Sequence, residues 1–222
     1  MYDFTQLVKI GWDDYARTTR AERDISSEYP MLKIFSGLLP KNSKILDVGC
    51  GSGKPITKYF FDEGFSVLGF DISPLQAKKA RLNLGHAKIF VADIKTHEFE
   101  DNAYEGIICL HSIEHVERIW HGVIFKKMYS ALKPGGLLLI SIQKDSCESV
   151  KFLNPYIQMY YSHFDQFETV KLITTAGFSI IYKSPIRISG EESVYAIAKK
   201  EEGVQPPKDP HTVYTSGQQV LG

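Results

Sequence analysis

The sequence Ile45-Leu46-Asp47-Val48-Gly49-Cys50-Gly51-Ser52-Gly53 joins a short apolar run to a turn that has glycine at alternate positions. The apolar run is typical of a buried β-strand, and the glycines permit a tight backbone turn after it. A second apolar run, residues 66–70, also ends in a carboxylate, Asp71. Together the two units predict half of a nucleotide-binding α/β sheet, with a backbone exposed to a ligand and an acid placed for a ribose.

The same alternation continues along the chain. We expect helices at about 74–84, 117–132 and 167–176, and further strands at 88–92, 106–110, 137–142, 178–188 and 193–198. Only a short link separates the last two strands, so they are expected to pair as an antiparallel hairpin. Residues 147–165 are aromatic and are expected to be irregular. The pattern predicts a mostly parallel sheet covered by helices on both faces.

The length and composition indicate one main domain. We expect a helical N-terminal arm or lid at residues 1–40, the α/β domain at 41–200, and a polar tail with several prolines at 201–222. The chain has 222 residues and a formal net charge of +0, so bulk charge gives no strong signal for nucleic acid. Oligomeric state is left open.

The cysteines and the apolar runs indicate the cellular compartment of the protein. Cys50, Cys109 and Cys147 have no CxxC spacing, which favours a reduced compartment and offers no disulfide framework or zinc site. The N-terminal sequence has no secretory pattern. No apolar run approaches the roughly 18 residues of a membrane span. We therefore expect a cytoplasmic protein with no membrane partner.

Polar groups follow four of the predicted strands. Asp47, Asp71, Asp93 and the pair Leu110-His111 all stand at carboxyl ends, where open α/β sheets bind their ligands. Asp71 is suited to accept from two ribose hydroxyls. The neighbouring residues extend the site: Ile72 can pack on a purine, and Asp93, with the Ile94 amide beside it, can accept from an exocyclic adenine amine.

From about Ser36 to Lys199, the chain resembles the class I S-adenosylmethionine-dependent methyltransferases. The segments that carry this likeness are Ile45–Gly53, residues 69–74 (GFDISP), 91–94 (VADI), 109–116 (CLHSIEHV) and 132–136 (LKPGG). The resemblance implies a Rossmann-like, doubly wound sheet of seven strands in the order 3-2-1-4-5-7-6. It also implies S-adenosylmethionine as cofactor and S-adenosylhomocysteine as product.

The resemblance assigns parts of the cofactor to this sequence. Asp47, Gly49 and the turn backbone would lie along the methionine moiety, the Leu110 carbonyl would take the ammonium group, and Asp71 the ribose. The complete set of expected cofactor-binding residues is Asp47, Gly49, Cys50, Gly51, Gly53, Asp71, Ile72, Asp93, Ile94, Leu110 and His111.

A nicotinamide-dinucleotide oxidoreductase is the main rival interpretation. Its G-x-G-x-x-G fingerprint needs a third glycine one place later, where this chain has Lys54. The chain also ends in a predicted antiparallel hairpin instead of a second mononucleotide-binding half. Both features favour the methyltransferase.

Methyl transfer mainly requires that acceptor and methyl group be aligned, and a general base adds to the rate when the acceptor is a weak acid. The candidate bases are His111, His115 and His163. Each of these histidines can equally be a packing residue near the cofactor. We expect no metal at the His111, Glu114 and His115 group, because no fourth ligand is evident.

Selection of the acceptor is expected to depend on the arm and on the aromatic stretch after the fifth strand. The candidate lid residues are Trp12, Tyr15, Arg17, Tyr156, Tyr160 and Tyr161. We expect the acceptor to be a small metabolite. The alternatives are tRNA or a protein side chain as acceptor, and a cofactor-binding partner protein without turnover.

Overall fold

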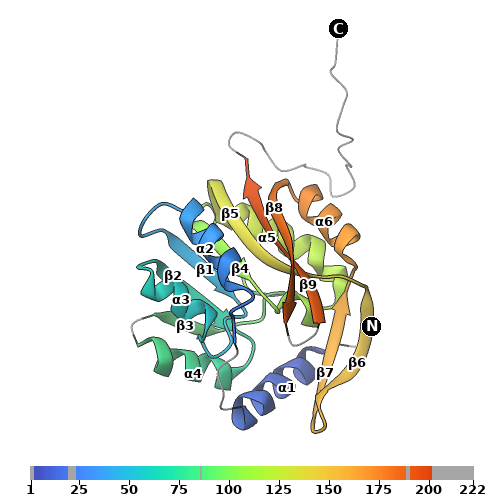
Figure 1. Ribbon diagram of the computed structural model, residues 1–222. Coiled ribbons are helices and arrows are strands. Elements are labelled where there is room, and N and C mark those ends of the chain that lie inside the picture. The colour runs from blue at the N-terminus through green and yellow to red at the C-terminus, as the bar shows by residue number, and fades with distance from the viewer. Residues whose placement is uncertain (1–2, 20–23, 86, 189–190, 202–222) are drawn as a thin grey trace.

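A computed structural model of the chain describes residues 3–19, 24–85, 87–188 and 191–201 (Figure 1). A seven-stranded sheet, in the order β3-β2-β1-β4-β5-β9-β8, forms its centre. β1 to β5 run parallel, whereas β9 is antiparallel to β5 and to β8. Counted within this sheet, β8 and β9 are its sixth and seventh strands. The predicted fold and the order 3-2-1-4-5-7-6 are therefore confirmed.

The described residues form helices and strands that alternate along most of the chain. In chain order they are α1 (Thr5–Thr18), α2 (Tyr29–Leu38), β1 (Lys44–Val48), α3 (Ile56–Asp62), β2 (Ser66–Asp71), α4 (Pro74–Leu84), β3 (Lys88–Val91), β4 (Tyr104–Cys109), the 3-10 turns η1 (Ile113–His115) and η2 (Arg118–Trp120), α5 (His121–Ala131), β5 (Leu132–Gln143), β6 (Cys147–Asn154), β7 (Ile157–His163), α6 (Gln166–Thr175), β8 (Phe178–Ile188) and β9 (Glu191–Lys200).

Each face of the sheet has its own core because successive strand residues point to opposite faces. Leu46, Ile107 and Leu138 pack with α5 and α6 on one face. Their chain neighbours Ile45 and Ile108 pack with α2 and α3 on the other. These strands are apolar on both sides, as a sheet covered by two helical layers requires.

The structure corrects the expectation for residues 147–165. This stretch forms a second, two-stranded sheet in which β6 pairs antiparallel with β7, from Cys147 opposite His163 to Asn154 opposite Ile157. The Asn154 side chain accepts from the Tyr156 amide in the turn, at 2.9 Å. At the base of the hairpin, the Gln166 amide donates to the Lys144 carbonyl. The β6–β7 hairpin thus projects from the end of the main sheet.

The bounds of one predicted helix and one predicted strand also differ from those in the structure. The expected helix over 117–132 is a 3-10 turn, η2, followed by the shorter α5. The expected strand over 137–142 is longer, because β5 begins at Leu132. An irregularity in the pairing of β4 with β5 lets Leu132 pair with Tyr104 while Leu137 pairs with Gly106.

The two N-terminal helices lie in different places. α2 is part of the main core, and Met31, Leu32 and Phe35 of this helix are buried against the sheet. α1 lies beside the β6–β7 hairpin (Figure 1) and contacts β7 and α4. Gly11 permits the close approach to β7, because a Cβ at this position would lie 2.8 Å from the Gln158 carbonyl oxygen. The proposed lid is thus α1, and the predicted boundary near residue 40 stays a prediction.

None of the helices within the described ranges is long and apolar enough to cross a membrane. The expected tail at 201–222 lies outside the described residues except for Glu201.

Candidate active site

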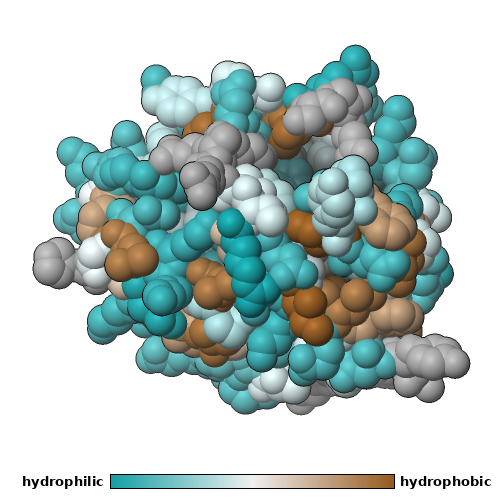
Figure 2. All heavy atoms as spheres, turned by 90° about the horizontal axis from the view of Figure 1, so that it is seen from below, coloured by the Kyte–Doolittle hydropathy of each residue, from teal (hydrophilic) through white to brown (hydrophobic). Residues whose placement is uncertain are grey.

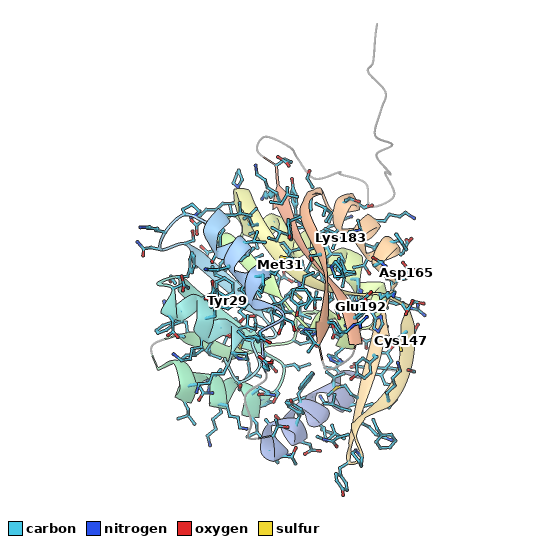
Figure 3. The ribbon with its side chains drawn as sticks, in the orientation of Figure 1. Tyr29, Met31, Cys147, Asp165, Lys183 and Glu192 are labelled. Atoms are coloured by element: carbon cyan, nitrogen blue, oxygen red, sulfur yellow. The ribbon has the colours of Figure 1, made fainter. Side chains whose placement is uncertain are left out.

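A cavity of about 1140 Å³ opens at the carboxyl ends of the parallel strands. The turn after β1, the ends of β2 and β4, α1 and the β6–β7 hairpin all contribute to its wall. Figure 2 views the molecule from below and shows apolar and polar side chains intermixed on that face. Cys147 and Glu192, labelled in Figure 3, bring β6 and β9 to the same wall. The cavity therefore joins the motif residues to segments distant in sequence.

The glycine turn is fastened to the end of β2. Gly49 and Gly51 have positive φ angles of 77° and 54°, which glycine adopts without steric cost. The amides of Gly49 and Cys50 both donate to the Phe70 carbonyl, at 2.9 and 3.0 Å. The Gly51 amide donates to Asp71 at 2.9 Å. The amides of Gly49, Cys50 and Gly51 are therefore all used within the protein.

The two strand-end acids Asp47 and Asp71 are deeply buried. Burial raises the pKa of Asp47 to about 7, although the Thr57 hydroxyl donates to it at 2.7 Å. Burial likewise raises the pKa of Asp71 to about 6, against the opposing effect of the Ser73 and Gly51 amides that donate to it. Both carboxyls lie in the cavity wall. Their charges are thus poorly solvated and are suited to accept from a ligand.

The other expected cofactor residues lie around these acids. Ile72, Asp93, Ile94, Leu110 and His111 all contribute to the cavity wall. Gly53 does not: a Cβ there would lie 2.6 Å from Leu84 of α4, so this glycine serves helix packing. Its predicted contact with the cofactor is not supported by this position.

His111 lies within a chain of polar groups. Its Nε2 is 2.6 Å from the Tyr195 hydroxyl and 3.7 Å from Glu28, and its Nδ1 is 3.5 Å from Glu114. Tyr195 in turn donates to Glu28. Both ring nitrogens of His111 are thus engaged by neighbours, so His111 is better placed to orient other groups than to accept a proton from a substrate.

His115 differs from His111 in having one nitrogen fixed by the backbone. Its Nδ1 lies 2.8 Å from the Tyr160 carbonyl oxygen. A carbonyl only accepts, so Nδ1 carries the proton and Nε2 holds the lone pair. Burial lowers the pKa of His115, which favours the neutral ring at neutral pH. These are the properties of a general base.

His163, the third candidate, also contributes to the cavity wall. Its Nδ1 is buried and has no hydrogen-bond partner among the residues that the structure describes. Burial lowers its pKa as well.

α1 closes the cavity from one side. Trp12 and Tyr15 line it, and the Trp12 ring meets the His115 ring edge to face at 5.3 Å. Asp13 of α1 accepts from the Ser73 hydroxyl at 2.5 Å and from the Leu75 amide at 3.1 Å. These donors stand at the N-terminus of α4, where the Ser73 side chain is the N-cap, so Asp13 adds a second acceptor there and ties α1 to the wall of the cavity.

Three of the predicted lid residues lie away from the cavity. Arg17 is exposed and pairs with Asp14, and Tyr156 is 90% exposed at the turn of the hairpin. The Tyr160 ring is buried and stacks on Phe4 at 4.0 Å, so only its backbone carbonyl serves the site. These three assignments are corrected, whereas Trp12, Tyr15 and Tyr161 line the cavity as expected.

Sequence reasoning left several site residues without a role. Glu114 was considered only as a metal ligand, although its carboxylate faces both His111 and the cavity. Glu28 and Tyr195 are 167 positions apart and carry no local signal. Asp13 stands in a helix without a motif around it. The only available clue was the position of Glu114 between His111 and His115, directly after a strand end.

The geometry fits S-adenosylmethionine better than a dinucleotide. A pyrophosphate binds to backbone amides that point at it, but the Gly49, Cys50 and Gly51 amides are satisfied within the protein. A Cβ at Gly51 would enter open space, which leaves room for a ligand along the turn. Asp71 retains lone pairs for ribose hydroxyls, since a carboxylate has about four acceptor positions.

Comparisons with known proteins agree with this interpretation. A family model described as "Methyltransferase domain" matches residues 20–182. Phosphoethanolamine N-methyltransferase 3 of Arabidopsis thaliana is 33% identical over 131 residues, which are 55% of this chain and 25% of that protein. Carboxy-S-adenosyl-L-methionine synthase of Campylobacter fetus is 28% identical over 170 residues, 73% of this chain and 70% of the relative.

A solved structure also shares the fold. The 1,6-didemethyltoxoflavin-N1-methyltransferase of Burkholderia thailandensis, with its substrate and S-adenosylhomocysteine bound, has a TM-score of 0.67 and 20% identity. The alignment covers 90% of this chain and 86% of that one. The family match extends over more than half of the chain and over every element of the site from α2 to the start of β8. The chain therefore belongs to the class I methyltransferases, whose methyl donor is S-adenosylmethionine.

Proposed function

We propose that the protein transfers a methyl group from S-adenosylmethionine to a small-molecule acceptor held between α1, the β6–β7 hairpin and the end of β4. The observation that carries the proposal is the continuity of the cavity. It runs from Asp71 and the glycine turn to His115 and the aromatic side chains of the lid. The names of relatives point to varied acceptors, since one is a phosphoethanolamine N-methyltransferase and another a ubiquinone biosynthesis O-methyltransferase.

The cavity has a cofactor half, at Asp47, Asp71 and the glycine turn, and an acceptor half, at His115 and the lid, and we assign different tasks to the two. Asp71, Asp47 and the glycine turn would hold the cofactor, which supplies an electrophilic methyl group on sulfur. Trp12, Tyr15 and α1 would cover the reacting groups and exclude water. His115 Nε2 would accept the proton of the acceptor, and the Tyr160 carbonyl would keep that nitrogen unprotonated beforehand.

Calorimetric titration with S-adenosylmethionine tests the cofactor half of the proposal. Asp71→Ala is expected to weaken binding by about 1.5–3 kcal/mol, because charged hydrogen bonds to the ribose would be lost. Asp62→Ala is the control, since Asp62 is exposed and pairs with Lys58 on the surface of α3. Wild-type protein that is folded but binds no cofactor would refute the proposal.

Transfer itself is tested with cofactor labelled at the methyl group. Label incorporated into small molecules of a metabolite extract supports the proposal. Label found only in tRNA or protein would favour a macromolecular acceptor, and cofactor binding without any transfer would favour a non-catalytic partner protein.

A further inference from the structure

Glu114 is a buried carboxylate with one unused oxygen. Glu114 is only 5% exposed and lies in the cavity wall. Oε1 faces His111, while Oε2 accepts no hydrogen bond from any residue that the structure describes. Burial opposes its charge, but interactions with His111, and smaller ones with His115 and the Gln143 side chain, outweigh burial and lower the pKa of Glu114 to about 2. An ionised oxygen left without a donor in such a place is costly unless a ligand supplies one.

Three lysines of the cavity wall are engaged by other residues, and a fourth, Lys151, has its Nζ 5.7 Å from the centroid of the Tyr161 ring. Lys95 pairs with Glu117 at 3.1 Å and Lys144 pairs with Glu192 at 3.3 Å. Lys79 donates to backbone carbonyls of α1 and the residue after it. His111, which lies 3.5 Å from Glu114, also lies 3.7 Å from a second buried carboxylate, that of Glu28.

Aromatic side chains line the same cavity as Glu114. The centroid of the His115 ring lies 5.3 Å from that of Trp12 and 4.8 Å from that of Tyr161. The centroids of the Tyr15 and Trp12 rings lie 5.4 Å apart. All four residues line the cavity. Aromatic faces attract cations, so a positively charged group gains from this wall as well as from Glu114.

We propose that the acceptor is an amine whose ammonium group binds Glu114 Oε2 beneath the aromatic wall of Trp12, Tyr15 and Tyr161. This proposal rests on the proposed function and names the class of acceptor. A nitrogen nucleophile gains positive charge as it is methylated, and a fixed carboxylate stabilises that charge. A phenolate or enolate nucleophile would be repelled by the same carboxylate, which disfavours the ionised form.

Methyl transfer to such an amine requires that its nitrogen first lose a proton. The ammonium group gives one proton to His115 Nε2, which frees the lone pair of the nitrogen. That lone pair forms the new bond to the methyl carbon while the carbon–sulfur bond breaks and its electron pair stays on sulfur. The product is an N-methylammonium group, again a partner for Glu114, and His115 later returns its proton to solvent.

A binding experiment tests the subsite without turnover. Protein saturated with S-adenosylhomocysteine is titrated with benzylamine, benzyl alcohol and benzoate, which share a ring and differ in charge. We expect benzylamine to bind at least tenfold more tightly than the other two. Glu114→Gln should weaken benzylamine by about ten- to hundredfold, whereas Asp145→Asn, which removes an exposed carboxylate of the same cavity wall, should preserve the preference. No detectable benzylamine binding, or a preference that survives Glu114→Gln, overturns the proposal.

A second measurement needs only the wild-type protein and covers the case in which Glu114→Gln does not fold. After transfer of a ¹³C-labelled methyl group to a metabolite extract, the carbon chemical shift identifies the atom that carries the methyl. Attachment to nitrogen supports the proposal. Attachment to oxygen, carbon or sulfur overturns it and leaves methyltransferase activity intact, whereas absence of any labelled product counts against the proposed function.

Discussion

Asp47 shows how a single buried carboxyl can lower the stability of the folded protein. Its carboxyl is 3% exposed, and its one strong partner in the described protein is the Thr57 hydroxyl. The pKa of Asp47 is raised from 3.8 to about 7, chiefly by burial. As the pH rises, the unfolded chain loses the proton of this carboxyl near pH 4, whereas the folded protein keeps it up to about pH 7. The protein therefore loses stability as the pH rises from about 4 to about 7, and does not regain it above that range.

Asp47→Asn is therefore expected to stabilise the protein at pH 8, by on the order of 2 kcal/mol, because the neutral amide avoids the burial of a charge. The gain should vanish near pH 4, where Asp47 is protonated in the folded wild type. Urea unfolding at the two pH values measures it. Asp62→Asn, at an exposed ion pair, should change stability by less than about 1 kcal/mol. Destabilisation of Asp47→Asn at pH 8 would contradict this reasoning.

His115 is expected to set the acid limb of the pH–rate profile. Burial lowers its pKa below 6.5, so the rate should fall as the pH drops through that lowered value. His115→Gln should remove this limb and reduce kcat by about 10²–10⁴-fold. The assay uses saturating cofactor, so that protonation of Asp71 near pH 6 does not contribute.

The matched control for that experiment is His97→Gln. Burial also lowers the pKa of His97, but this residue packs among Phe70, Phe90 and Phe99. An acid limb that persists in His115→Gln, or that is lost in His97→Gln, would exclude His115 as the base.

Among the elements, α1 depends on close contact with the hairpin. Gly11→Ala would place a Cβ 2.8 Å from both the Gln158 carbonyl oxygen and the Met159 side chain. We expect a loss of about 1–3 kcal/mol in unfolding free energy or local detachment of α1, seen as faster proteolysis within this helix. Gly37→Ala in α2 meets no atom within 4 Å and should stabilise slightly. Equal behaviour of the two variants would show that α1 does not pack tightly.

The elements also show what the sequence could and could not predict. Strands such as β1 are buried on nearly all positions, so their apolar runs are evident. β6 has no buried residue and presents no alternating pattern, because it lies on the outer side of β7 and is held mainly by backbone pairing. α1 could be expected as a helix, but its contact with β7 depends on Gly11, whose meaning appears only when the hairpin is in place.

At the scale of the whole molecule, ligand binding and stability are coupled. A ligand that binds only the folded protein stabilises it by about 2.7 kcal/mol when present at 100 times its Kd. For a chain of this length, S-adenosylhomocysteine at that excess should raise Tm by roughly 5–10 °C. Asp71→Ala at the same concentration should show a clearly smaller shift. Thermal scans of both proteins with and without ligand measure it, and an unchanged wild-type Tm would contradict the assigned cofactor site.

The sheet order and the gathering of the strand-end acids at one cavity were predictable, because strand-end acids and glycine turns are local signals. The acceptor half was not, since its contacts join distant single residues. The Glu28 carboxylate meets Tyr195 from the opposite end of the chain, and the Tyr160 carbonyl fixes a ring of the earlier His115. No spacing rule links such pairs before the fold brings them together.

The backbone hydrogen bond from Gln166 to Lys144 closes the base of the β6–β7 hairpin. The chain thus leaves the main sheet and returns to it at neighbouring points, and the strands that hold the cofactor residues lie outside this excursion. Such a segment is a natural site for grafting: hairpins of other length or sequence can be exchanged there while the sheet retains its register. Under the proposed function, exchange of this hairpin would change the choice of acceptor and leave the use of the methyl donor undisturbed.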